Sequence, residues 1–445
     1  LVLSEQSGGI PALTSAAIVK YDAAGKELWA VSMEGNAVVY ALDADTDGTL
    51  YAAGNFMDVV KYTGADGASA EMNSATVYSA FVAKISADGK FQAVKTFTPA
   101  VDATVAAAVG DPWGAGFESP LYTMWDPIYV APNKIQVDGD KVYVSAKYMG
   151  DVAALGWEGS YIDMFGMMYS DNYSMGVFSL NKADLTGEAS VANVQMTGIT
   201  ADTQYYPEAL TFAAENGTVY VGFIGFQKLT LTTAAGNFTF AAAEDGSTME
   251  HAFVLATIGA TTTTKTYHVE AHGQLAVPYN LFMDVAGENL IIGGTFHGQL
   301  PFDTQKSAGE LKTDLFTASV KKADGTVNNT FVAGKEIEAT SMSVTGDKAN
   351  VTSTAAELYQ VDLTAGTATT VATQQAILCA DAATTVYAEK TKVCINSTVE
   401  AIAGIQQVIR PTVQVDGLIY NLAGQPVSDN YKGIVIRNGK KYMVK

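Results

Sequence analysis

The sequence is poor in arginine, and this scarcity bounds the classes of partner. Arginine occurs only at Arg410 and Arg437, and 26 basic residues face 46 aspartate and glutamate residues, giving a formal net charge of −20. A surface of this sign repels the phosphates of nucleic acids and of anionic lipids. Nucleic acid and direct membrane adsorption are therefore poor candidates, whereas neutral glycans and cationic proteins remain open as partners.

Cysteine is almost absent, since only Cys379 and Cys394 occur. In a secreted chain the two could form a disulfide, because both lie in one strand-rich stretch. Two buried free thiols are equally common in folded proteins. The sequence favours neither alternative.

Long apolar runs and helical periodicity are also missing. No run reaches the ~18 residues that a membrane helix needs, so we expect no transmembrane segment. Charged residues make up 16% and hydrophobic residues 48% of the chain, which argues against disorder. The opening residues LVLSEQSGG lack an initiator methionine, which indicates a mature or trimmed form whose targeting segment is not present in this chain.

A repeated hairpin pattern runs through most of the sequence. Residues Ser79–Phe97 read SAFVAKISADGKFQAVKTF, with two apolar runs of period two on either side of a glycine turn, as in a β-hairpin. The pattern recurs, more loosely in the last two copies, at Ala16–Val31, Gly176–Val191, Leu315–Phe331, Ala252–Val269 and Glu357–Val371.

A second hairpin type alternates with the first. It occurs at Ala37–Ala53, Ile135–Ala146, Ala209–Gly222, Phe282–Gly293, Ser341–Thr352 and Ala376–Ala388. An inner and an outer hairpin together form a four-stranded unit, and such units stack radially in a β-propeller. We expect an all-β propeller of six blades, with five and seven as alternatives. The N-terminal hairpin Ala16–Ser32 should complete the blade that begins at Ala376–Ala388 and so close the ring.

Two phrases carry a resemblance to a known family. The second hairpin type often reads DG-x-hydrophobic-Y-hydrophobic-G, and the first reads AFVAKxxxxGK. Together they resemble the bacterial β-propeller repeat family of surface and secreted proteins, over most of residues 15–390. The resemblance implies a propeller domain at residues 1–398 and a secreted or outer-surface location, and it implies no ligand.

The last thirty residues form a separate pattern. Asp416–Lys445 alternates apolar and polar residues, with turns at Ala423–Gly424 and Asn438–Gly439. We expect residues 399–445 to be a linker and a small C-terminal β module. The phrase IYNLAGQPV…KGIVIRNGKKYMVK is similar to the C-terminal sorting tails of secreted Bacteroidetes proteins. The resemblance implies an export or anchoring signal, and the alternative is a folded β appendage.

One acidic turn has the spacing of carboxylates that could bind a metal ion. Asp43, Asp45 and Asp47 alternate before Gly48, as carboxylates do in a calcium loop. Gly54 occupies the position where a bidentate glutamate would complete such a loop, and other copies have a hairpin turn here. We therefore favour turn chemistry over a structural Ca²⁺ ion and expect no other cofactor. His268, Glu270 and His272 also alternate, but polar residues on an outer strand explain them equally well.

Aromatic residues gather in two insertions near the second blade. Residues 110–129 read GDPWGAGFESPLYTMWDPIY, and residues 156–175 read GWEGSYIDMFGMMYSDNYSM. Aromatic faces beside carboxylates suit the C–H faces and hydroxyls of sugars, and also suit protein contacts. The alternative is that the loops bury their own aromatics. The predicted ligand-binding residues are Trp113, Trp125, Trp157, Tyr122, Tyr161, Asp126 and Glu158.

No catalytic residue is predicted. The sequence has no G-x-S-x-G elbow, no P-loop, no H-E-x-x-H motif and no cysteine near a histidine. The favoured interpretation is a secreted, non-enzymatic binding propeller whose partner is a glycan or a protein at the cell surface, with the oligomeric state open. The alternatives are a carbohydrate-active glycoside hydrolase or lyase that uses loop carboxylates, and a structural scaffold.

Overall fold

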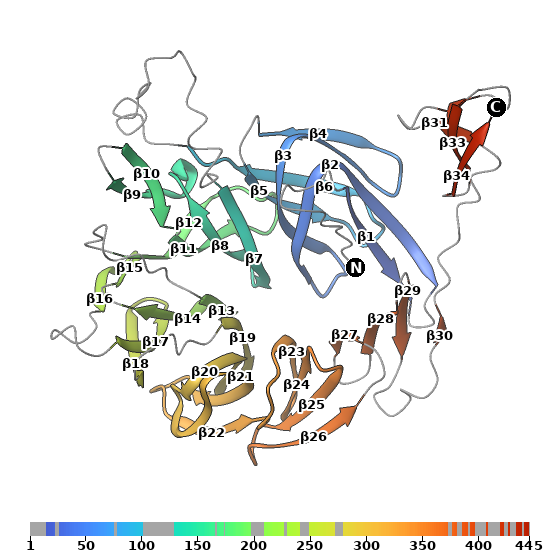
Figure 1. Cartoon of the computed structure of the whole chain (residues 1–445). Helices are drawn as coiled ribbons and strands as arrows, with labels where there is room; N and C mark the ends of the chain where they lie inside the picture. Colours follow the sequence, from blue (N-terminus) through green and yellow to red (C-terminus); the bar gives the residue numbers. More distant parts are fainter. Residues whose placement is uncertain are drawn as a thin grey trace.

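The protein is a ring of antiparallel sheets, shown as a computed structural model in Figure 1. The structure describes residues 15–22, 26–74, 78–100, 129–164, 167–172, 174–196, 209–226, 229–240, 249–271, 279–372, 376–380, 385–389, 392–396, 406–407, 419–421, 426–427, 433–437 and 440–444.

Six sheets follow one another around the ring in sequence order. The first contains β1 (Ala16–Tyr21), β2 (Glu27–Ala44), β3 (Leu50–Thr63), β4 (Ser69–Asn73), β5 (Ser79–Ile85) and β6 (Phe91–Phe97). The second contains β7 (Tyr129–Asp138), β8 (Lys141–Met149), β11 (Ser174–Asn181) and β12 (Ala189–Met196), extended by β15 (Leu229–Thr233) and β16 (Gly236–Phe240). The short helix η1 (Ala153–Leu155) and the pair β9 (Ser160–Met164) and β10 (Met167–Asn172) lie between β8 and β11 in the chain.

The other four sheets have four strands each. The third contains β13 (Ala209–Glu215), β14 (Thr218–Phe226), β17 (Met249–Ile258) and β18 (Thr262–Ala271). The fourth contains β19 (Tyr279–Ala286), β20 (Asn289–Leu300), β21 (Asp303–Lys321) and β22 (Val327–Val332). The fifth contains β23 (Ala339–Thr345), β24 (Lys348–Ser353), β25 (Glu357–Asp362) and β26 (Thr367–Ala372). The sixth contains β27 (Ala376–Ala380), β28 (Thr385–Glu389), β29 (Lys392–Asn396) and β30 (Gln406–Gln407).

The prediction of an all-β, six-bladed propeller is confirmed. The strands β2, β7, β13, β19, β23 and β27 are the innermost strands of the six blades, and each contacts the next along the series. Each predicted hairpin is present as an antiparallel strand pair. The apolar runs and the glycine turns between them were sufficient to locate the hairpins.

The predicted closure of the ring is wrong. The N-terminal hairpin β1–β2 does not join the sixth blade, because β2 continues without a break from that hairpin into the innermost strand of the first blade. The sixth blade instead obtains its outer strands from β29 and β30, downstream of β28. The sequence analysis missed these two strands because β30 is only two residues long.

The strand β2 has an irregularity at Gly35. The register with β3 slips between Glu34 and Asn36, and Gly35 has a φ of 126°. A Cβ atom there would lie 2.8 Å from the carbonyl oxygen of Val59, so only glycine fits. The fold returns the N-terminal hairpin over one face of the first sheet, where Ile18 and Met33 pack in a core that also contains Phe81. The indole Nε1 of Trp29 donates to the carbonyl oxygen of Ala87 at 2.9 Å and anchors the far end of this hairpin.

A hairpin of the third blade extends the second blade. β15 and β16 lie between β14 and β17 in the chain, yet β15 pairs with β12, the outer strand of the second blade. Leu229 and Leu231 on β15 are buried in the core between the two blades, with Phe223 of β14. The second and third blades are therefore joined by the addition of this hairpin as well as by packing.

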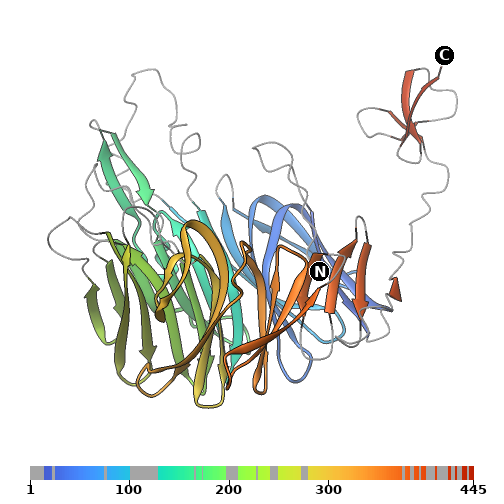
Figure 2. The same cartoon turned by 60° about the horizontal axis from the view of Figure 1, so that its bottom comes forward.

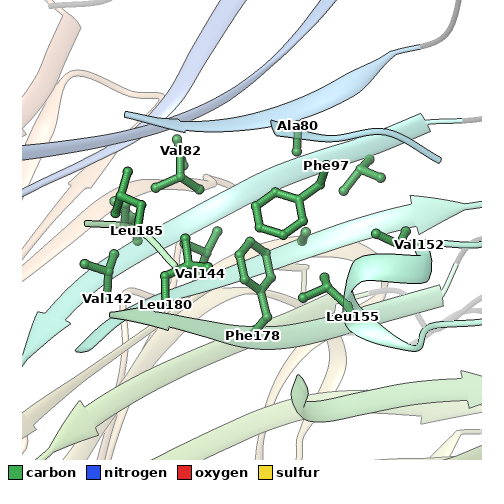
Figure 3. Packing of buried hydrophobic residues seen from close by; sticks show 14 of the residues in the cluster. Ala80, Val82, Phe97, Val142, Val144, Val152, Leu155, Phe178, Leu180 and Leu185 are labelled. Atoms are coloured by element: carbon green, nitrogen blue, oxygen red, sulfur yellow. The ribbon is translucent and has the colours of Figure 1, made fainter. Parts of the chain in front are cut away.

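The main cores lie between neighbouring blades. Figure 3 shows the interface of the first two blades, where Phe97 of the first and Phe178 of the second lie side by side. Their ring centroids are 4.7 Å apart. Similar cores fill the next three interfaces. Burial on both faces explains why the strands are apolar almost throughout.

Side chains of β7 bind the open edge of β13. The amide of Gln136 donates to the carbonyl oxygen of Ala214 at 2.9 Å and accepts the Ala214 N–H at 3.0 Å. The carboxylate of Asp138 accepts the N–H groups of Asn216 and Gly217 at 3.0 and 2.7 Å. An innermost strand has no neighbour on one side, so these bonds satisfy main-chain groups that would otherwise lack a protein partner.

The C-terminal strands form a further small sheet. It contains β31 (Ile419–Asn421), β32 (Pro426–Val427), β33 (Gly433–Arg437) and β34 (Lys440–Val444), in the order β32-β31-β33-β34. Figures 1 and 2 show it outside the ring of six blades. The division of the chain at residue 399 and the sorting role of this tail stay predictions. No helix in the described part of the chain is long and apolar enough to cross a membrane.

Candidate functional site

The long insertions of the blades lie on one face of the ring. Strand direction alternates within a blade, so the connection from the second to the third strand lies on the same face as the connection to the next blade. The second-to-third connections of the first four blades contain β4, the η1–β9–β10 segment, β15–β16 and the extended end of the β20–β21 hairpin. Figure 2 shows β9 and β10 standing above the ring. We call this face the insertion face.

The two connections that contain the aromatic segments start beside each other on the insertion face. Residues 110–129 belong to the connection between the first and second blades, and residues 156–175 belong to the second-to-third connection of the second blade. Ala100 and Asp151, at the start of these two connections, exchange main-chain hydrogen bonds of 2.9 and 2.7 Å. At the end of the first connection, Val130 N–H donates to the carbonyl oxygen of Tyr78 at 2.9 Å. Both connections therefore start at the junction of the first two blades.

Several predicted ligand-binding residues lie outside the described residues. These are Trp113, Tyr122, Trp125 and Asp126, and for Tyr161 the structure describes only the backbone, on β9. Their role in binding stays a prediction.

Trp157 is a core residue and does not face a ligand. Its side chain is 1% exposed and stacks on Tyr148, with ring centroids 4.8 Å apart. The indole Nε1 donates to the hydroxyl of Ser190 at 2.7 Å. Gly176 makes room for the indole, because a Cβ atom there would lie 2.5 Å from the ring. The alternative that the loops bury their own aromatics therefore holds for Trp157.

Glu158, the next residue, is exposed. Its carbonyl oxygen accepts a hydrogen bond from the amide of Gln195 at 2.6 Å, which fixes the backbone on the insertion side of the blade. The carboxylate of Asp151 accepts the Gly159 N–H at 2.6 Å and holds the same turn. Glu158 is thus the predicted ligand-binding residue whose side chain is described and available to solvent.

The three carboxylates of the predicted calcium loop bind three different partners. Asp43 accepts the Val137 N–H of the second blade at 2.7 Å. Asp45 forms an ion pair with Lys182 at 2.7 Å, and Asp47 accepts the N–H of Thr49 at 2.8 Å. Burial raises the pKa of Asp43, whereas the hydrogen bond to the Lys182 side chain lowers the pKa of Asp45. The arrangement is that of a hairpin turn and an interblade contact, and the choice between turn chemistry and a Ca²⁺ ion stays a prediction.

Metal ligands are not clustered elsewhere in the described ranges, where no three residues among His, Cys, Asp and Glu are grouped to hold an ion. The side chains of His268 and Glu270, and the whole of His272, lie outside what the structure describes.

The two cysteines occupy strands that are not neighbours. Cys379 on β27 lies opposite Val386, and Cys394 on β29 lies opposite Tyr387, so that β28 separates them. Two strand spacings amount to about 9–10 Å, whereas the Cα atoms of a disulfide are usually within ~7 Å. The disulfide stays a prediction, and this register favours the alternative of two free thiols.

Lys134 is a central residue that the sequence analysis missed. It lies on β7, and its ammonium group donates to the carbonyl oxygens of Phe212 on β13 and Met283 on β19, at 2.6 and 2.5 Å. Burial lowers the pKa of Lys134 to about 8, against the opposing effect of Asp284 and Asp43. In the sequence, NKIQVDGDK resembles any other strand and turn, so no local signal marked this lysine.

Comparisons with known proteins add the likeness of fold. No family model and no curated protein matches the sequence. Among solved structures, BamB from Moraxella catarrhalis is 12% identical with a TM-score of 0.34, covering 89% of this chain and 93% of BamB. A virginiamycin B lyase from Staphylococcus aureus, catalytically inactive and with quinupristin, is 9% identical with a TM-score of 0.36, over 87% and 100% of the two chains. AztD from Citrobacter koseri is 10% identical with a TM-score of 0.36, over 86% and 89%. At such values the likeness carries no argument about what this chain binds.

Proposed function

We propose that the chain is a secreted, non-enzymatic binding propeller that recognises neutral glycans through its insertion face. The observation that carries the proposal is the pairing of Ala100 with Asp151, because it brings together the starts of the two connections that contain the aromatic segments. Three of the four tryptophans lie in these segments, and Trp113 and Trp125 are the two that we propose to contact the ligand.

The charge of the chain supports a neutral ligand. A net charge of −20 disfavours sulfated and other polyanionic glycans, which an acidic surface repels. Tryptophan and tyrosine rings present an apolar face to sugar C–H groups, and an exposed carboxylate such as Glu158 accepts hydrogen bonds from sugar hydroxyls.

The test is a binding screen of the intact chain against neutral oligosaccharides of glucose, mannose, galactose and xylose. We expect at least one to raise the melting temperature, since a ligand at 100 times its Kd stabilises a protein by ~2.7 kcal/mol. The variants Trp113→Ala and Trp125→Ala should weaken that response, while Leu28→Ala, an exposed residue of the N-terminal hairpin, serves as the control. A response unchanged in both tryptophan variants would contradict the proposal.

The same screen separates the alternatives. If a bound glycan is also cleaved, and Asp126→Asn or Glu158→Gln abolishes cleavage while binding persists, the chain is a carbohydrate-active enzyme. Absence of any glycan response would remove glycan recognition and leave a protein partner or a scaffold role.

A further inference from the structure

The innermost strands of four blades carry a β-bulge at the same place in the repeat. In β2 the register slips between Val39 and Ala41, in β7 between Pro132 and Lys134, in β19 between Tyr279 and Phe282, and in β23 between Ala339 and Ser341. On the second strand of each blade, the equivalent positions are Leu50, Val142, Leu290 and Ala349. In each blade the register slips at the fourth residue counted from that position. Bulges often re-aim a side chain at a functional site.

The extra residues of these bulges are polar and exposed. They are Tyr40, Asn133, Asn280 and Thr340; in β19, Asn280 and its half-buried neighbour Leu281 lie opposite the single residue Gly294. These four residues therefore occupy equivalent positions on innermost strands, which border the centre of the ring. We call them the bulge ring.

Neighbouring groups hold the bulge ring in place. The side chain of Asn55 hydrogen-bonds to the hydroxyl of Tyr40, whose side chain remains exposed, with a residue exposure of 50%. The amide oxygen of Asn133 accepts from Ser145 at 2.6 Å, and its nitrogen donates to the carbonyl oxygen of Leu210 at 3.2 Å. An amide has two N–H groups and two acceptor directions, so Asn133 keeps one of each for a ligand.

Thr340 is held by the same kind of contact as Asn133. The hydroxyls of Thr340 and Thr352 lie 2.7 Å apart, and Thr352 is the residue equivalent to Ser145. Asn280 has a φ of 51°, in the left-handed region that asparagine tolerates better than most residues. The second and fifth blades thus orient Asn133 and Thr340 by the same kind of contact, a hydroxyl on the second strand of the blade.

The bulge ring carries no charge. The nearest ammonium, on Lys134, is directed to the carbonyl oxygens of Phe212 and Met283. What remains is an aromatic face, two amides and a hydroxyl, a set that stacks on a sugar ring and exchanges hydrogen bonds with its hydroxyls.

We propose that Tyr40, Asn133, Asn280 and Thr340 form a second part of the ligand site, which binds one neutral sugar unit at the centre of the ring. This inference rests on the proposed function, and it adds contacts at the ring centre to those of the aromatic segments.

The experiment measures the affinity of the intact chain for the neutral oligosaccharide that gives the largest response in the screen above. Tyr40→Ala, Asn280→Ala and Thr340→Val are compared with Leu28→Ala, a control on the same strand as Tyr40 with 53% exposure. Asn133 is left intact because it also binds main chain of the third blade. Each ring variant should lose ~10-fold in affinity, as expected for one stacking or hydrogen-bonding group, while the control stays within ~2-fold.

The outcomes separate the two proposals. If Trp113→Ala or Trp125→Ala weakens binding but all three ring variants bind like the wild type, the bulge ring is not part of the site and the proposed function stands. If no neutral oligosaccharide binds the wild type, both proposals fail. Melting temperatures of the variants, measured without ligand, must remain near that of the wild type for a loss of affinity to count as support.

Discussion

The ammonium group of Lys134 lies 2.5 Å from the carbonyl oxygen of Met283, so a side chain of the second blade binds main chain of the fourth. It also reaches the carbonyl oxygen of Phe212 in the third blade at 2.6 Å and lies over the Phe212 ring, 5.2 Å from its centroid. One amine therefore joins three consecutive blades at the centre of the ring.

The titration of Lys134 should make stability depend on pH. Its pKa is lowered from 10.5 to about 8 by burial, so the folded chain releases this proton at lower pH than the unfolded chain. Below pH 8 both states hold the proton, and between pH 8 and 10.5 only the unfolded state holds it. The contribution to the free energy of unfolding therefore rises with pH in this window, by at most about 1.4 kcal/mol per pH unit.

The measurement is urea unfolding of the wild type and of Lys134→Met at pH 7, 8, 9 and 10. The difference in unfolding free energy between wild type and variant should be flat from pH 7 to 8 and rise from 8 to 10. Comparing the two proteins cancels the titration of groups that they share. A difference that falls with pH above 8 would contradict the lowered pKa.

Removing the Trp157 side chain should destabilise the protein without affecting ligand binding directly. Trp157→Ala loses a buried indole, its stacking on Tyr148 and its bond to Ser190, for which we expect a loss of about 3–5 kcal/mol in unfolding free energy. Trp157→Phe keeps a ring in the core and should lose less. Glycan affinity of Trp157→Phe should match the wild type, and a large drop in affinity at unchanged stability would return this residue to the ligand site.

The Asp43 carboxylate should stabilise the junction of two blades through hydrogen bonding. Asp43→Ala leaves the Val137 N–H without its acceptor, and we expect a loss of about 1–3 kcal/mol. Asp47→Ala, which affects an exposed turn, is the control and should lose less. Chelation by EDTA should change the melting temperature of neither variant nor of the wild type. A fall on chelation that disappears in Asp47→Ala would instead establish the calcium loop.

Both cysteines should react as free thiols. In the unfolded, unreduced chain a thiol reagent should titrate two groups, because β28 lies between Cys379 and Cys394. A Cys379→Ala variant should then show one group. Zero thiols in the wild type, with one in the variant, would show that the pair forms a disulfide.

Local patterns predicted the hairpins well and their partners less well. The run SAFVAKI fixes β5 because its residues are buried on both faces. The position of β1 depends instead on Gly35, where one positive φ redirects the chain over the first sheet. No period-two pattern encodes such a fold, and for this reason the predicted closure failed.

The candidate site residues were chosen from the composition of two segments, and the packing of the structure then showed which of the described ones are buried. Trp157 and Glu158 are adjacent in the sequence and equally suited to a sugar site, yet one is buried and the other exposed. The bulged residue Tyr40 was missed because a bulge is a mismatch between two strands and has no signature in one of them.

The addition of β15–β16 to the second blade limits how this ring can be divided into repeats. In an array of independent repeats, one unit can be deleted or duplicated and its neighbours still find complete partners. Here a deletion of the third blade would also remove β15 and β16 from the second, and would expose Val194 and the edge of β12. The second and third blades, which span Tyr129–Ala271, therefore form one structural unit, and any recombinant ring must carry them together.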